Sequence, residues 1–186
     1  MFKASPRLYV RPGPGAVLSR GVTLIELMVT LSVFAILAVM AAPSFSAMMI
    51  GNRIVAQTNE LIAALHFARS EAIKLNRSVT FCKLDTETSN ACSSVSGTWA
   101  FWGVLSPHGV VRRGSIPPGN GLLVGTNLPA SGLTFKPDGL AYVGASLADH
   151  RLEVWSCGAG RPQDNLNTIG LGAGSRLAIT KSARGC

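Results

Sequence analysis

The sequence predicts an α+β chain in which one long N-terminal α-helix packs on an antiparallel β-sheet domain. Three observations lead to this fold class. No charged side chain occurs from Leu27 to Asn52, a run long enough for a membrane-spanning helix. Between Arg53 and Asn76, apolar or small residues recur every three or four positions, which is the spacing of one helix face. After Asn76 come short alternating or aromatic runs between loops rich in glycine and proline, as in antiparallel sheets.

The first twenty-one residues form a basic leader. They hold Lys3, Arg7, Arg11 and Arg20, four of the seventeen basic residues, and none of the nine acidic ones. The other thirteen basic and nine acidic residues give the rest of the chain a formal charge of +4. Positive charge before an apolar span orients the N-terminus toward the cytoplasm, so the C-terminal domain is expected on the opposite side of the membrane.

A single carboxylate, Glu26, stands at the start of the apolar run, within the segment Gly21-Val22-Thr23-Leu24-Ile25-Glu26-Leu27. An ionisable group in a membrane helix costs several kcal/mol at the bilayer centre and less near its ends, so a use for the charge is expected. The run is too long for a secretory signal peptide, whose apolar core has about 7–15 residues. A plain membrane anchor explains the run, but it has no need of Glu26 or of the glycine before Val22.

This segment resembles the N-terminus of the type IV pilins and of the pseudopilins of type II secretion. The match consists of Gly21, Thr23 to Leu27, and Pro43; Val22 stands where phenylalanine is usual. The resemblance implies a type IV pilin-like fold and a prepilin peptidase that cuts after Gly21 and N-methylates Val22. It also implies that Glu26 guides assembly with other pilins or pseudopilins. The implied location is the inner membrane, single-pass, with the C-terminal domain in the periplasm and later in a filament.

We expect one helix from Val22 to about Asn76. The expected organisation is a cleaved leader over 1–21, an apolar transmembrane and filament-core half over 22–50, an amphipathic half over 51–77 and a β-sheet domain over 78–186. Pro43 removes a backbone donor and should bend or loosen the helix. The side chains expected to face the sheet form one stripe: Ile54, Thr58, Leu61, Leu65, Ala68, Ala72 and Leu75.

Six strands are expected in the C-terminal domain, over residues 78–82, 99–105, 133–135, 140–143, 151–157 and 176–181. The turn Lys136-Pro137-Asp138-Gly139 predicts a hairpin between the third and the fourth. The segments 106–121 and 158–175 are expected to be loops. The glycines at 170–174 lack the Gly-Lys-Ser/Thr ending of a phosphate-binding loop, so a connector is favoured.

The segment ALHFARSEAIKLNRSVTFC, which ends at Cys82, gives a narrower resemblance. Together with a second cysteine, the strand with Trp99 and Trp102, and the turn from Phe135 to Gly139, it is similar to the GspH/FimT family of minor pilins and pseudopilins. That family contains the H-type pseudopilin of type II secretion and the FimT and FimU minor pilins, which the sequence does not separate. The resemblance implies a structural subunit.

Four cysteines, Cys82, Cys92, Cys157 and Cys186, fit an oxidising compartment and allow three disulfide pairings. Sequence proximity favours Cys82–Cys92, which leaves Cys157–Cys186. No two cysteines have the spacing of a zinc site, so no metal is expected. No catalytic constellation or cofactor motif stands out, so neither enzyme activity nor a cofactor is expected.

Basic residues near the C-terminus support an alternative function, DNA binding in DNA uptake. Beyond Asp164 the chain has Arg176, Lys181 and Arg184 and no acid, and such residues bind phosphates regardless of sequence. Some FimT-like proteins implicated in DNA uptake carry a Gly-Arg-x-Arg motif near the C-terminus. This chain ends Ser-Ala-Arg-Gly-Cys without that motif, so a solvated loop face is favoured over nucleic-acid contact.

Overall fold

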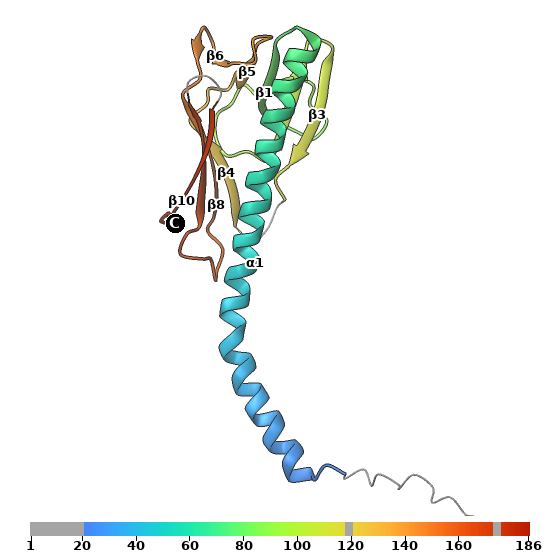
Figure 1. Cartoon of the computed structure of the whole chain (residues 1–186), viewed down its shortest axis with the longest axis vertical. Helices are drawn as coiled ribbons and strands as arrows, with labels where there is room; N and C mark the ends of the chain where they lie inside the picture. Colours follow the sequence, from blue (N-terminus) through green and yellow to red (C-terminus); the bar gives the residue numbers. More distant parts are fainter. Residues whose placement is uncertain (1–20, 118–120, 173–175) are drawn as a thin grey trace, which may run out of the picture. The chain divides into compact units, whose positions relative to one another are not determined.

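A computed structural model describes residues 21–117, 121–172 and 176–186 (Figure 1). The predicted leader up to residue 20 and parts of the two predicted loops lie outside these residues. The described parts form one helix, α1 (Leu24–Leu75), and ten strands. The chain divides into two compact units, Met1–Val39 and Met40–Cys186. Helix α1 is continuous through Pro43 and Gly51.

The strands form two antiparallel sheets. The six-stranded sheet has the order β3-β2-β1-β5-β6-β7; its members are β1 (Val79–Leu84), β2 (Phe101–Ser106), β3 (Gly109–Ser115), β5 (Leu133–Phe135), β6 (Ala141–Val143) and β7 (Ser146–Leu147). The four-stranded sheet has the order β10-β9-β8-β4; its members are β4 (Leu122–Thr126), β8 (His150–Ser156), β9 (Leu166–Gly172) and β10 (Arg176–Ser182). In Figure 1 the second half of α1 lies against both sheets.

The second half of α1 and both sheets share one hydrophobic core. The predicted stripe is confirmed, because every member is buried except Leu75, which is partly buried. One polar contact joins the helix to the four-stranded sheet in this interface: Thr58 Oγ1 donates to the carbonyl of Ile54 at 2.7 Å and accepts from Asn167 Nδ2 of β9 at 3.1 Å. Burying one leucine contributes about 1.5–3 kcal/mol, so the stripe fixes this half of the helix on the sheets.

The expectation of a single sheet with six strands is wrong, because two sheets are present. The segment 106–121, expected to be a loop, contains β3, and the segment 158–175 contains β9. Strands β4 and β7 were also not expected. Strand β3 is the edge partner of β2, and β9 lies between β8 and β10. Their glycines and the asparagine of β9 have low strand propensity, so pairing with neighbours decides the conformation of these two strands.

The predicted hairpin is confirmed, with Thr134 paired to Tyr142 across β5 and β6. Gly139 has φ of +76°, which a side chain would strain. Asp138 holds the turn: one carboxylate oxygen accepts from the Leu140 N–H at 2.8 Å and the other from the Tyr142 hydroxyl at 2.9 Å. The hydrogen bond from Leu140, aided by that from Tyr142 and by the charge of Lys136, lowers the pKa of Asp138. The same carboxylate raises the pKa of Tyr142.

Acid should remove the contribution of Asp138 to stability. Because its pKa is lower in the folded than in the unfolded chain, this contribution is complete above the unfolded pKa of about 3.9 and is lost as the pH falls through the folded value. We expect Asp138→Asn to lower the free energy of unfolding at pH 6 and to make a smaller difference at pH 2.5. Urea unfolding of both chains across this range measures it. If the difference in free energy of unfolding between the two chains does not change with pH, the proposed contribution of the Asp138 carboxylate to stability is wrong.

Two disulfides join the cysteines in the predicted pairs. Cys82 of β1 is bonded to Cys92, ten residues further on, and Cys157 at the end of β8 is bonded to Cys186, twenty-nine residues further on. The second bond connects Cys186 to the residue that directly follows β8, an inner strand of the four-stranded sheet.

Replacing both Cys157 and Cys186 by serine should lower the free energy of unfolding by about 2–4 kcal/mol. The matched control is the double serine variant of Cys82 and Cys92. That disulfide closes a shorter loop, which restricts the unfolded chain less, so a smaller loss is expected. Urea denaturation of the oxidised chains measures both losses. A larger loss from the Cys82–Cys92 pair would contradict the loop-length argument.

Candidate functional site

Helix α1 begins immediately after the residues predicted to be cut. Thr23 caps the helix: its Oγ1 accepts a hydrogen bond from the N–H of Glu26 at 3.3 Å, and its carbonyl accepts from the N–H of Leu27 at 3.1 Å. Thr23-Leu24-Ile25-Glu26 therefore has the spacing of a capping box, with threonine at the N-cap and glutamate three residues later. The Thr-x-x-Glu spacing in the sequence is a signal from which this cap could have been predicted.

Glu26 lies in the first turn of α1 and its side chain is exposed. A negative charge at this position is favoured by the partial positive charge of the helix N-terminus. Among the described residues, no cation forms an ion pair with Glu26. The carboxylate therefore remains available for a partner. Val22 lies outside the helix, two residues before Leu24, the first residue of α1.

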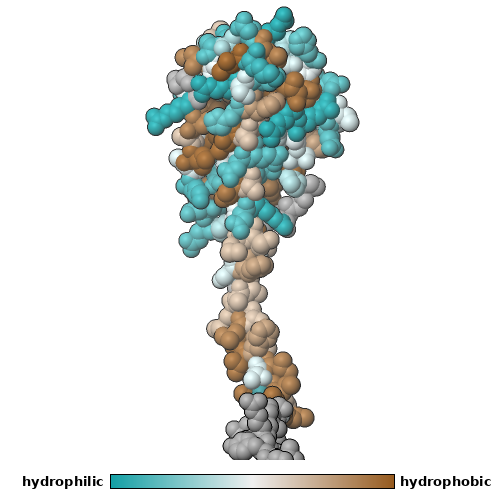
Figure 2. Space-filling model, turned by 45° about the vertical axis from the view of Figure 1, so that its right-hand side comes forward, coloured by the Kyte–Doolittle hydropathy of each residue, from teal (hydrophilic) through white to brown (hydrophobic). Residues whose placement is uncertain are grey.

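Most side chains from Leu27 to Met40 are apolar, and they are exposed on all sides of the helix, for example Leu31, Phe34 and Leu37. In Figure 2, hydrophobic colour covers this part of α1, whereas most of the domain surface is hydrophilic. By length and composition, α1 is the one helix of the described residues that could cross a membrane. Exposed apolar surface of this extent marks a membrane or protein interface.

The hydroxyl groups inside this apolar stretch are satisfied within the helix. Thr30 Oγ1 donates to the carbonyl of Leu27 at 2.9 Å, and Ser32 Oγ donates to the carbonyl of Val29 at 2.8 Å. An unpaired hydroxyl would cost several kcal/mol in a hydrocarbon environment. Glu26, in contrast, is the ionisable group of the stretch, and it has no ion-pair partner among the described residues.

The three basic residues of the alternative function do not form one patch. Arg176 and Lys181 are exposed at opposite ends of β10, about 17 Å apart at roughly 3.3 Å per residue. Because their separation is odd, they point to opposite faces of the strand. Arg184 is engaged elsewhere: its Nη1 forms an ion pair with Glu153 at 2.5 Å, and its guanidinium lies 4.0 Å from the ring centroid of Trp155.

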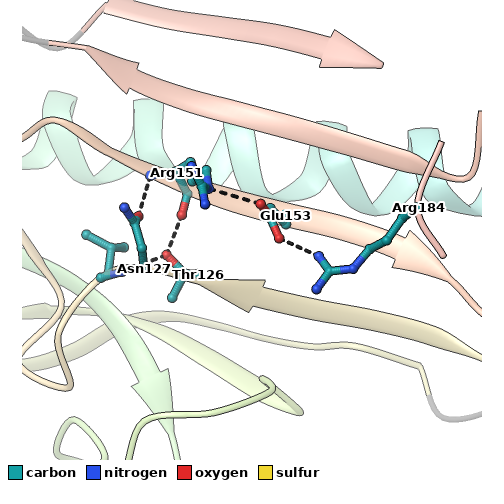
Figure 3. A network of polar contacts seen from close by, with 6 residues as sticks. Thr126, Asn127, Arg151, Glu153 and Arg184 are labelled. Carbon is teal, nitrogen blue, oxygen red and sulfur yellow. Dashed lines mark hydrogen bonds and ion pairs between the residues drawn. The ribbon is translucent and has the colours of Figure 1, made fainter. Parts of the chain in front are cut away.

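Figure 3 shows the network that holds Arg184. Glu153 also pairs with Arg151, whose Nε lies 3.0 Å from the carboxylate. The main chain of Arg151 is anchored in turn, since its N–H donates to Asn127 Oδ1 and its carbonyl accepts from Thr126 Oγ1. Two arginines thus share one carboxylate, so Arg184 is held against the domain, and the three groups together keep one net positive charge.

Within the described residues, no group of three His, Cys, Asp or Glu side chains could hold a metal ion. The four cysteines are all in disulfides. The described N-terminal segment presents one carboxylate, that of Glu26, and an apolar helix surface.

Comparison with known families identifies the chain. A family model described as type II transport protein GspH matches residues 57–164, more than half of the sequence. The chain belongs to the GspH family. A model of the prokaryotic N-terminal methylation motif matches residues 18–42, which include Gly21, Val22 and Glu26. The chain is thus a minor pilin or pseudopilin of the type IV filament class, and comparison with curated protein sequences gives no match.

Solved structures of two proteins resemble this GspH-family chain. The type IV minor pilin FimU of Pseudomonas aeruginosa is 18% identical, with a TM-score of 0.51 over 69% of this chain and 89% of its own. The minor pseudopilin EpsH of Vibrio cholerae is 13% identical, with a TM-score of 0.47 over 69% of this chain and 97% of its own. The likeness to FimU shows that the type IV pilin-like fold predicted from the sequence is present.

Proposed function

We propose that this chain is a membrane-anchored minor subunit of a type IV filament, cut between Gly21 and Val22 and N-methylated at Val22. The observation that carries the proposal is the start of α1. A capped helix begins just after the proposed cut site and continues as an exposed apolar surface. Its first turn presents one carboxylate that has no ion-pair partner in the described parts of the chain. The methylation motif covers the same residues.

The proposed topology follows from the charges. The basic leader, residues 1–21, keeps the N-terminus in the cytoplasm, and prepilin peptidase removes it. Residues 22–50 then span the inner membrane once, residues 51–77 continue the helix along the domain, and residues 78–186 form the domain in the periplasm. The oxidising periplasm accounts for the two disulfides.

Assembly is the step that uses Glu26. Cleavage creates an α-amine on Val22, and methylation keeps its positive charge. We infer that Glu26 pairs with this amine, on its own chain or on a neighbouring subunit, as the subunit leaves the bilayer. In a low-dielectric helix bundle, the pairing offsets part of the cost of burying either charge. The apolar side chains after Glu26 then pack in the filament, and Pro43 gives the helix a place to bend or loosen.

The role is structural rather than catalytic, and it belongs to one of two related machines. The description of the matching family supports a type II secretion pseudopilus, and a type IV pilus is the other member of the class. Deletion of the gene separates the two machines. If exoproteins then stay inside the cell and are no longer secreted, the chain belongs to a pseudopilus. If surface pili and twitching motility are lost, it belongs to a pilus. Secretion and motility unchanged in the deletion strain would contradict both assignments.

Intact mass and N-terminal sequence of the membrane-extracted chain test the proposal directly. We expect the chain to begin at Val22 and to carry one additional methyl group on its amine. The control is the same chain from cells that lack prepilin peptidase, which should keep the leader. A chain that retains its leader in cells with a working peptidase would overturn the proposal.

A further inference from the structure

A groove lies between α1 and the loop that connects β8 to β9, residues 157–165. Its volume is about 470 Å³, and its lining residues all belong to the second compact unit: Ala42, Phe45, Ser46, Met49, Ile50, Arg53, Gly158 and Ala159. Five of the lining residues have apolar side chains, and Arg53 is the charged residue among those that line the groove. The groove therefore combines an apolar floor with a cation.

The loop approaches the helix closely at this groove. Gly160 has φ of +74°, and a Cβ built on it would lie 2.8 Å from Ser46 Oγ. A Cβ built on Gly51 would lie 3.9 Å from Cγ of Pro162. The loop and residues 46–51 of α1 are thus at the same level along the helix.

This level is where the apolar part of the helix ends. Twenty residues from Leu24 reach Pro43, which is enough to cross a hydrocarbon layer of about 30 Å. Beyond that point Phe45, Met48 and Met49 are still exposed, and Arg53 is the first charged residue after Glu26. In an anchored chain, residues 44–53 therefore lie in the headgroup region of the bilayer.

Two arginines are exposed near this groove: Arg53 lines it, and Arg161 lies on the loop between Gly160 and Pro162, the two residues that approach α1. Among the described residues, neither forms an ion pair. The acidic residue of the same loop is Asp164, which lies three positions after Arg161 and next to the buried Asn165. Guanidinium groups recognise phosphate oxygens by paired hydrogen bonds.

We propose that this groove binds a phospholipid of the surrounding bilayer. An acyl chain lies against Phe45 and Met49, and the phosphate lies against Arg53 and Arg161. The inference rests on the proposed membrane anchoring and adds a partner to it. A second copy of the chain is a poorer occupant, because at the same membrane depth it presents the same two arginines. The bound lipid would hold the domain in one orientation on the membrane before assembly.

Photo-crosslinking of the full mature chain in vesicles tests this inference. The vesicles contain phosphatidylethanolamine and phosphatidylglycerol, and a photoreactive amino acid replaces the exposed Gln163 of the loop. The matched control carries it at the exposed Ala145, in the link between β6 and β7, at the other end of the domain (Figure 1). Mass spectrometry should find phospholipid adducts at position 163 and none at position 145.

Charge variants show whether the arginines hold the lipid. Arg53→Gln and Arg161→Gln should each reduce the adduct at position 163 by about fivefold, as expected for one basic side chain at an anionic surface. Arg53→Lys and Arg161→Lys keep the positive charge and should therefore keep most of the lipid adduct at position 163. Arg176→Gln, which removes an exposed charge on β10, should leave it unchanged.

Flotation of the vesicles separates the two ideas. A chain that does not float with the vesicles contradicts the proposed anchoring. A chain that floats but gives no lipid adduct at position 163 overturns the lipid site alone. Adducts with a second copy, or lipid adducts that do not depend on the two arginines, would overturn it as well.

Discussion

Replacing Glu26 by leucine should leave the chain in the membrane and remove it from filaments. Leucine is favourable in a membrane helix, so anchoring persists. In a filament the variant leaves the Val22 amine of its partner without a counter-charge. Removing one member of a buried ion pair costs about 3–5 kcal/mol, which corresponds to a loss of incorporation of roughly 100-fold or more.

Sheared filaments from cells that lack the native gene measure this loss, as the ratio of variant in filaments to variant in membranes. Thr30→Leu is the matched control, because it adds leucine to the same helix, and the Thr30 hydroxyl is already bonded to a carbonyl of its own helix. Glu26→Gln keeps the shape and removes the charge, so it should resemble the leucine variant. Incorporation of Glu26→Leu at the level of the native chain would rule out the proposed role.

The sequence predicted the features that depend on local patterns. The helix stripe from Ile54 to Leu75 follows from periodicity alone, and burial confirms it. The turn at Asp138 follows from the residues that such turns require, and the pairing of β5 with β6 confirms it. These predictions succeed because the physical cause lies within a few residues of sequence.

Features that depend on distant contacts could not be predicted. Strand β9 contains Asn167, a residue unusual in strands, but its amide is buried and bonded to Thr58, 109 residues earlier. Strand β3 contains Arg112, whose guanidinium lies 5.5 Å from the ring of Phe67 on α1 and 5.8 Å from that of Trp102 on β2. In both strands, tertiary packing outweighs local propensity.

The candidate site shows the same difference between features set by local sequence and features set by distant contacts. Gly21, Val22 and Glu26 were predicted from a contiguous motif, and their roles stay predictions. Arg184 was grouped with two other basic residues by sequence position, whereas its partner Glu153 lies 31 residues away on β8. Pairing across strands, which the sequence does not display, decides which charges remain free to bind a ligand.

Replacing Gly21 by leucine should block removal of the leader. A Cβ built on Gly21 has no atom of the described residues within 4 Å, so the substitution does not disturb the folded chain. Any effect must then arise in the peptidase, where glycine permits close approach of the backbone. We expect the membrane-extracted chain to keep all twenty-one leader residues, whereas Val22→Phe, which introduces the residue usual in this family, should be processed normally.

The uncut chain should also be absent from filaments, because Val22 then has no free amine to pair with Glu26. This links the two variants. If cleavage and the carboxylate serve the same ion pair, the double variant Gly21→Leu/Glu26→Leu should be no worse in assembly than either single one, since residues that act through one interaction are not additive. Efficient assembly of the uncut Gly21→Leu chain would show that the amine is dispensable, and the pairing with Glu26 would then have to be abandoned.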